Sequence, residues 1–195
     1  MQVFPNNIHQ KGANKMYTTA LYSPENPLSD ELFSELFEIL EYSFPEDERR
    51  DFEAQLAKSN CPEFRTMTLS DNGKILGFLN FWELSDFVYL EHFAVDKSQR
   101  GKGLGSEMIK QLCAICTGKT IVLEAEPPEL NEFSARRIEF YRRLGFHTNP
   151  FPYKQPPYRK GDNPVELVIM SSPLPLSESD FAEKIREIYR RVYDC

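Results

Sequence analysis

The spacing of apolar and polar residues divides the chain into strand-like and helix-like segments. Strand patterns fall at residues 16–22, 65–69, 74–84, 87–95, 120–126 and 165–171, with one more starting at Phe146. Asn72-Gly73 separates two of these segments and is typical of a hairpin with a type I′ turn. We therefore expect a mixed central sheet of about six to seven strands.

Amphipathic helix patterns lie between the predicted strands and after the last one. Ser29 or Asp30 can cap the first helix, and Pro45 suits the first turn of the second. The predicted helices cover about 30–44, 45–58, 103–117, 131–144 and the tail from Glu178. The order of strands and helices predicts an α/β (α+β) fold, with helices flanking the sheet and an amphipathic helix at the C-terminus.

The length of 195 residues is enough to bury one sizeable core. Residues 1–15 are polar and lack periodicity, so we expect a loose N-terminal extension. Residues 16–174 are expected to form a single domain. Residues 175–195 are expected to form a helix packed on that domain or at a dimer contact, which makes the protein a monomer or a homodimer.

Composition narrows the class of protein. Apolar residues make up 41% of the chain and aromatic residues 13%, which excludes wholesale disorder. A net charge of −7 and a pI near 5.1 argue against nucleic-acid binding. No apolar run is long enough to span a membrane, and the first residues lack a signal-peptide pattern, so no membrane partner is expected.

The four cysteines show no disulfide framework. Cys113-x-x-Cys116 lies within an apolar helix stripe without a second such pair or a pair of histidines, so we expect no metal site. Reduced cysteines are the default in the cytoplasm, which is the expected location.

A glycine-rich turn is the strongest chemical signal. A strand ends at Val95-Asp96, Arg100-Gly101-Lys102-Gly103-Leu104-Gly105 follows, and a helix pattern begins at once. Glycines let backbone N–H groups turn toward an anion, and the helix N-terminus adds free N–H groups and a positive dipole end. Gly105 comes one residue too early for a dinucleotide fingerprint, and no lysine immediately precedes Ser106 as in a P-loop. The turn is therefore expected to bind another kind of pyrophosphate.

The remaining pattern, Arg100-x-x-Gly103-x-Gly105 after a strand, resembles motif A of the GNAT superfamily of N-acetyltransferases, which binds the pyrophosphate of acetyl-CoA. The segment from Tyr141 to Phe146, read as Tyr-x-x-x-Gly-Phe, is similar to the end of motif B. The resemblance covers residues 63–171. It implies a GNAT fold in which the fourth and fifth strands, here 87–95 and 120–126, splay apart around the pantetheine arm.

The resemblance implies acetyl-CoA as the cofactor and coenzyme A as the product. Tyr141 matches the tyrosine that approaches the coenzyme sulfur as a general acid in many members. Ser134 stands where many members carry an asparagine that bonds the pantetheine. The implied coenzyme-binding residues are Phe93 and Val95 through their backbone, Ser134, and the turn residues Arg100, Gly101, Lys102, Gly103, Gly105 and Ser106.

Glu91 is the best candidate for the catalytic base. It shares a strand face with Phe93 and Val95, and its apolar neighbours are expected to raise its pKa toward a useful range. Its role would be to take the proton from the amine or to orient that amine. His92 points to the other face and is expected to pack in the core.

Two more carboxylates and an aromatic loop are candidates for the acceptor side. Glu124 and Glu126 share one face at the end of their strand and could receive a cationic substrate, and Glu126 could act as the base through an ordered water. Residues 149–163 are rich in proline and aromatic residues and are expected to form a lid or wall. The expected substrate-binding residues are Glu126, Tyr153 and Tyr158.

Together, these expectations describe an acyltransferase that moves an acetyl group from acetyl-CoA to a primary amine by direct attack in a ternary complex. The acidic chain favours a small cationic amine as the acceptor. Two alternatives stay open. The acceptor could be a protein N-terminus or a lysine, or the chain could be an acyl-CoA binding or sensing module that lacks turnover.

Overall fold

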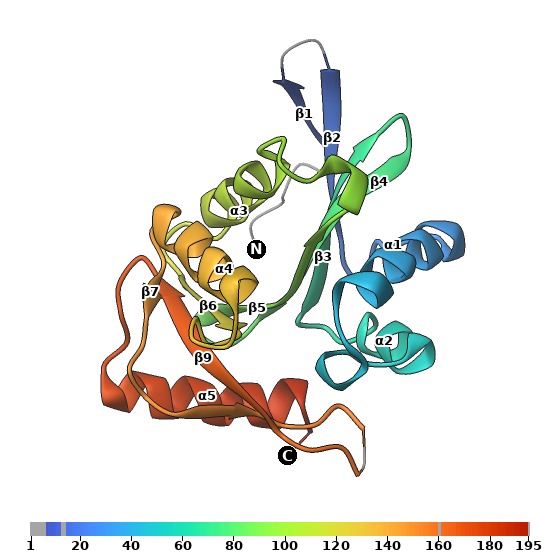
Figure 1. Cartoon of the computed structure of the whole chain (residues 1–195). Coiled ribbons are helices and arrows are strands. Elements are labelled where there is room, and N and C mark those ends of the chain that lie inside the picture. Colours follow the sequence, from blue (N-terminus) through green and yellow to red (C-terminus); the bar gives the residue numbers. More distant parts are fainter. Residues whose placement is uncertain (1–6, 13–14, 160, 195) are drawn as a thin grey trace. The chain divides into compact units, whose positions relative to one another are not determined.

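A computed structural model describes residues 7–12, 15–159 and 161–194 (Figure 1). The chain forms two units, Met1–Trp82 with Glu91–Ile115 and Glu83–Leu90 with Cys116–Cys195. We call them the first and the second unit. β5 (Phe87–Val95) begins in the second unit and ends in the first. The single domain expected over residues 16–174 stays a prediction.

The first unit contains the antiparallel strands β1 (Asn7–Gly12), β2 (Lys15–Tyr22), β3 (Phe64–Asp71) and β4 (Lys74–Glu83), which lie in that order. The last residue of β4, Glu83, already belongs to the second unit. The turn between β3 and β4 has φ of 49° at Asn72 and 82° at Gly73. Two successive positive φ angles are the requirement of a type I′ turn. The predicted hairpin is therefore confirmed.

β1 lies in the segment for which the sequence predicts a loose extension. Asn7–Gly12 pair with β2, from Asn7 opposite Ala20 to Gly12 opposite Lys15. The expectation of a loose segment is wrong for these residues, because strand pairing uses backbone groups and needs no apolar alternation. Residues 1–6 and 13–14 lie outside the described residues.

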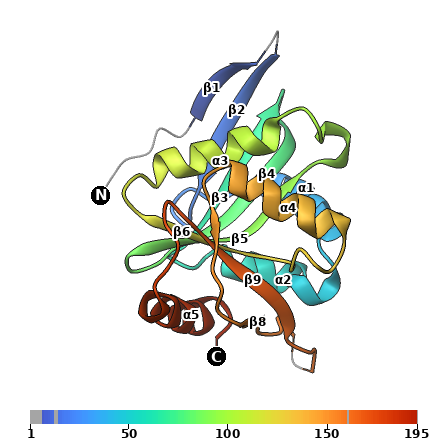
Figure 2. The ribbon, with the colours of Figure 1, turned by 60° about the vertical axis from the view of Figure 1, so that its left-hand side comes forward.

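The helices α1 (Asp30–Ser43), α2 (Phe52–Lys58) and α3 (Leu104–Ile115) belong to the first unit. α1 and α2 lie on one side of β3 and β4, and α3 lies on the opposite side (Figures 1 and 2). The Ser29 hydroxyl accepts a hydrogen bond from the Leu32 N–H and caps α1, as predicted.

The prediction of a single helix over residues 45–58 is wrong. Glu46–Glu48 form only a 3-10 turn (η1), and the backbone at Arg49 is extended. α2 starts after Asp51, whose side chain accepts a hydrogen bond from the Ala54 N–H. A strong cap inside the segment thus begins a new helix.

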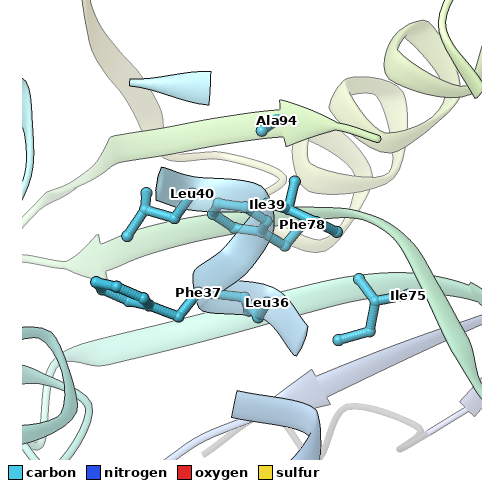
Figure 3. Packing of buried hydrophobic residues seen from close by; sticks show 7 residues of the cluster. All are labelled: Leu36, Phe37, Ile39, Leu40, Ile75, Phe78 and Ala94. Atoms are coloured by element: carbon cyan, nitrogen blue, oxygen red, sulfur yellow. The ribbon is translucent and has the colours of Figure 1, made fainter. Parts of the chain in front are cut away.

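The core between α1 and the strands is formed by buried apolar side chains that lie close together (Figure 3). α1 contributes four of them, β4 contributes two and β5 contributes one. They are Leu36, Phe37, Ile39, Leu40, Ile75, Phe78 and Ala94. Their burial fixes α1 against the strands.

Gly77 in β4 is required by close packing. A Cβ added there would lie 2.9 Å from the Ala94 carbonyl oxygen and 3.0 Å from Met108 Sδ. Gly77→Ala is therefore expected to lower the free energy of unfolding by about 1–3 kcal/mol, the usual effect of overpacking. Urea unfolding followed by circular dichroism measures this change. An unchanged midpoint would show that β5 and α3 can shift to accommodate the methyl group without a loss of stability.

In the second unit, Phe87–Leu90 of β5 pair in parallel with Thr120–Leu123 of β6 (Thr120–Ala125). β9 (Val165–Ser172) runs antiparallel to β6 and also pairs with β7 (His147–Thr148) and β8 (Tyr153–Gln155). The fold is thus a mixed α/β fold, as predicted. The described residues form nine strands instead of six to seven, because the sequence pattern did not predict β1 or β8.

α4 (Glu132–Arg143) and α5 (Glu178–Val192) lie on opposite sides of the strands of the second unit (Figure 1). The predicted apolar stripe of the C-terminal helix is confirmed, since its four members are all buried. They are Phe181, Ile185, Ile188 and Val192. Among the described residues, no helix combines the length and the apolar character needed to cross a membrane.

Candidate active site

The glycine-rich turn of the first unit has the backbone of an anion site. Gly101 and Gly103 have φ of 77° and 80°, and a Cβ added at either would meet no atom within 4 Å. Glycine is therefore required there by the backbone conformation and not by packing. α3 begins at Leu104, so the free N–H groups of its first turn adjoin the two glycines.

Two cations flank this turn. Arg100 Nε–H donates to the Val95 carbonyl oxygen (3.1 Å), and Lys102 Nζ donates to the Ser98 carbonyl oxygen (3.1 Å) and to Gln99 Oε1 (2.9 Å). All three contacts are with uncharged oxygens, so the positive charges can act on an anion at the turn. The turn and its cations fit a pyrophosphate.

Asp96 holds the start of the turn in place. Its carboxylate accepts from the Ser98 N–H (2.8 Å), from the Ser98 hydroxyl and from the Tyr42 hydroxyl (2.8 Å). The hydrogen bond from Ser98 is the main influence that lowers the pKa of Asp96. The C-terminal end of α1 is thereby tied to the turn.

The strand before the turn has one face more exposed than the other. Phe93 and Val95 are half-buried, whereas His92 and Ala94 are buried. Glu91 keeps some exposure as a residue, but its side chain is fully buried. This alternation agrees with the predicted shared face of Glu91, Phe93 and Val95. The binding of pantetheine by the backbone of Phe93 and Val95 stays a prediction.

Glu91 is part of a buried ion pair. Its side chain is 0% exposed, its Oε1 lies 2.5 Å from Arg50 Nη1, and its Oε2 accepts a hydrogen bond from Trp82 Nε1–H (2.9 Å). Burial is the largest influence and would raise the pKa of Glu91. The combined effect of Arg50, His92 and Trp82 outweighs it and lowers that pKa. The predicted upward shift is therefore wrong, because sequence alone did not reveal Arg50.

His92 is packed, as the sequence predicts. It is 1% exposed, its Nε2 lies 3.1 Å from the Glu48 carbonyl oxygen, and its ring meets the Phe44 ring edge-on at 4.9 Å. Burial is the main influence that lowers its pKa, which favours the neutral ring. Contacts from β5 to Glu48 and Arg50 thus fix the segment between α1 and α2.

Tyr141 lies in α4 of the second unit and is 6% exposed. Its ring contacts Phe140 and Phe146, with centroids 5.2 and 5.7 Å away. Burial raises the pKa of Tyr141 to about 12, so its hydroxyl keeps its proton at neutral pH. The helix ends as the motif predicts, with Gly145 at φ 86° and the Phe146 N–H donating to the Tyr141 carbonyl oxygen.

Ser134 and Glu126, predicted for coenzyme and substrate respectively, contact each other. The Ser134 hydroxyl is fully buried and donates to Glu126 Oε2 (3.1 Å), and Arg137 Nη1 lies 3.2 Å from the same oxygen. Glu126 thereby ties the end of β6 to the first turns of α4. A ligand that binds Ser134 or Glu126 would therefore have to replace this contact or bind beside it.

Glu124, the neighbouring carboxylate of β6, is surrounded by tyrosine hydroxyls. Tyr153 of β8 donates to its Oε1, and Tyr193 donates to the same carboxylate at 3.1 and 3.3 Å. The Tyr193 hydroxyl also lies 3.1 Å from that of Tyr89 and 3.4 Å from that of Tyr158. We call Glu124 and these four tyrosines the tyrosine cluster.

Two tyrosines of the cluster, Tyr153 and Tyr193, remain protonated. Burial, followed by the charge of Glu124, raises the pKa of Tyr153 and of Tyr193 well above the ordinary value. The sequence pointed to Glu124, Tyr153 and Tyr158 but missed Tyr89 and Tyr193. Neither belongs to a motif, and Tyr193 is 69 residues from Glu124 in the chain.

Comparison with known proteins agrees with the fold and the motifs. Residues 29–146 match the family model described as "Acetyltransferase (GNAT) family". YjbC of Bacillus subtilis (strain 168) is 27% identical over 117 residues, which are 59% of this chain and 60% of YjbC. The chain thus spans less than two thirds of the length of this curated relative.

Solved structures extend the comparison to most of the chain. A GNAT-family structure from Bacteroides thetaiotaomicron has a TM-score of 0.82 and 29% identity, covering 91% of this chain and 98% of that one. An aminoglycoside 6′-N-acetyltransferase complexed with coenzyme A has a TM-score of 0.58 and 17% identity, covering 82% and 99%. The second likeness concerns the fold alone. The family match and the motif geometry together show that the chain belongs to the GNAT family of acetyltransferases.

Proposed function

We propose that this protein transfers an acetyl group from acetyl-CoA to a primary amine. The observation that carries the proposal is the turn Arg100–Ser106, where two positive-φ glycines, a helix N-terminus and two cations suit a pyrophosphate. One structural neighbour, the aminoglycoside 6′-N-acetyltransferase, is complexed with coenzyme A, which supports the choice of cofactor. The acceptor is proposed to be a small cationic amine.

The reaction balances without any further reactant. The neutral amine nitrogen forms a bond to the acetyl carbon, the carbon–sulfur bond breaks, and the amine loses one proton while the coenzyme thiolate gains one. Tyr141 is proposed to stabilise the leaving thiolate by donating its hydroxyl proton in a hydrogen bond.

Glu91 is not retained as the base in this proposal. Both of its oxygens are bound, by Arg50 and by Trp82, and its pKa is lowered. A buried carboxylate in such an ion pair serves to hold β5 against the segment before α2. Glu124 is the better candidate to receive the ammonium group, because it is half-buried among hydroxyl donors and aromatic rings.

Turnover is tested by incubating the protein with acetyl-CoA and each of four amines: spermidine, kanamycin, a peptide that begins with alanine and a peptide with one internal lysine. Release of coenzyme A is followed with a thiol reagent, and mass spectrometry identifies the acetylated product. We expect turnover with spermidine or kanamycin. Binding of acetyl-CoA without turnover of any amine would instead identify an acyl-CoA binding module.

Tyr141→Phe is expected to lower kcat by about 10²-fold and to leave acetyl-CoA affinity nearly unchanged, because only the proton donor is lost. Phe140→Leu, which removes a neighbouring ring without touching a hydroxyl, is the control and should change kcat little. Steady-state kinetics with the best amine measures both variants. Equal kcat for Tyr141→Phe and the wild type would remove Tyr141 from the chemical step.

A further inference from the structure

α5 is fixed to the second unit by polar contacts along its length. Lys184 Nζ, on a residue 6% exposed, donates to Asp86 Oδ2 (2.7 Å) and lies 4.7 Å from the centre of the Phe87 ring. Glu187 Oε1 accepts from the Ser85 N–H (3.0 Å) and the Ser85 hydroxyl (2.7 Å). These contacts set where the residues after the helix lie.

Tyr189 repeats this pattern one turn before the end of α5. Its hydroxyl donates to the Lys154 carbonyl oxygen (2.6 Å), and its ring lies 5.9 Å from that of Tyr153. β8 is thus bound to the helix by a backbone oxygen and by ring packing. Tyr193 is the first residue after α5, and its hydroxyl, unlike that of Tyr189, donates to the carboxylate of Glu124.

The number of available protons determines which groups donate and which accept in the hydrogen bonds of Tyr193. A phenol has one proton to donate, and an ionised carboxylate has none. Tyr193 therefore donates to Glu124, and the hydroxyls of Tyr89 and Tyr158 donate to Tyr193. The donated protons all lead toward one carboxylate, which stabilises its charged form and restricts its rotation.

We propose that Tyr193 is a positioning residue of the acceptor site, which holds the Glu124 carboxylate in the orientation that receives the ammonium group of the amine. The proposal rests on the proposed function and adds the C-terminal helix to the acceptor site. Glu124 is half-buried, and the hydroxyls of Tyr153 and Tyr193, from β8 and from the end of α5, both donate to its carboxylate. The aromatic rings beside it suit an alkylammonium group.

Kinetics separates positioning from mere support of the fold. Tyr193→Phe keeps the ring and removes the hydroxyl, so we expect kcat/KM for the best amine of the four to fall about tenfold, with the KM for acetyl-CoA unchanged. Tyr189→Phe is the matched control, because its hydroxyl binds a backbone oxygen on the same helix, and it should behave as the wild type. Equal kcat/KM in Tyr193→Phe and Tyr189→Phe would overturn the proposal.

A binding measurement decides the proposal even if none of the four amines is acetylated. Binding of n-butylammonium chloride is followed by NMR titration of the full chain. We expect saturable binding that weakens at least threefold in both Tyr193→Phe and Glu124→Gln but not in Tyr189→Phe. Unaltered affinity in Tyr193→Phe, or no saturable binding by the wild type, would overturn the inference, whereas absence of turnover alone would overturn only the proposed function.

Discussion

Arg50→Met is expected to lower the free energy of unfolding by about 3–5 kcal/mol, because it leaves the buried Glu91 carboxylate without its charged partner. The side chains of Arg50 and Glu91 are 4% and 0% exposed, and the neutral Trp82 Nε1–H, which also donates to that carboxylate, cannot replace the charge of Arg50. Urea unfolding followed by circular dichroism at neutral pH measures the change.

Arg136→Met is the matched control. Arg136 and Glu132 are the same 2.5 Å apart, but their side chains are 68% and 77% exposed. Removal of such a surface pair is expected to change stability by less than about 1 kcal/mol. Equal losses in the two variants would show that burial does not set the strength of the Arg50–Glu91 pair.

The difference between the wild type and Arg50→Met should also depend on pH. The pKa of Glu91 is lowered in the folded protein, so its pair stabilises the fold above the ordinary value of 4.5 and ceases to do so as the pH falls through the folded value. Without Arg50, burial raises the pKa of Glu91. Protonation at lower pH then removes the buried charge, and the variant loses less stability. Unfolding measured at decreasing pH should therefore show a shrinking difference.

Gly103→Asp is expected to weaken acetyl-CoA binding by roughly 10²-fold or more, because it adds a negative charge to the proposed pyrophosphate site. The φ of 80° at Gly103 adds backbone strain, although the new Cβ would meet no atom within 4 Å. Calorimetric titration with acetyl-CoA measures the affinity.

Gly73→Asp is a close control for this variant. Gly73 has φ of 82°, and a Cβ there also meets nothing within 4 Å, but it belongs to the β3–β4 turn. The control carries the same strain and charge and should bind acetyl-CoA like the wild type. A folded Gly103→Asp variant with undiminished affinity would refute the assignment of the turn.

Features that depend on neighbouring residues were predictable from the sequence. The Asn72-Gly73 hairpin, the Ser29 cap, the glycine turn before α3 and the end of α4 at Gly145 each need a backbone conformation that a few local residues specify. β1 and the division at Asp51 were not predicted. The first depends on pairing with β2, and the second depends on competition between two possible helix starts.

Features that depend on distant partners were predicted only in part. The strand period placed Glu91 and His92 on opposite faces, but Arg50 lies 41 residues away and reversed the expected pKa shift of Glu91. The tyrosine cluster shows the same limit, because Tyr193 joins Glu124 only once α5 has packed. A strand pattern tells which way a side chain points and not which side chain meets it.

Because the chain passes between the two units more than once, neither unit can be obtained by a simple truncation. The boundaries at Trp82/Glu83, Leu90/Glu91 and Ile115/Cys116 leave each unit built from two separate segments. No single cut of the backbone yields one whole unit, so a truncated chain would lack part of a sheet or its covering helix. Each half could be expressed alone only after its two segments were rejoined by a new linker.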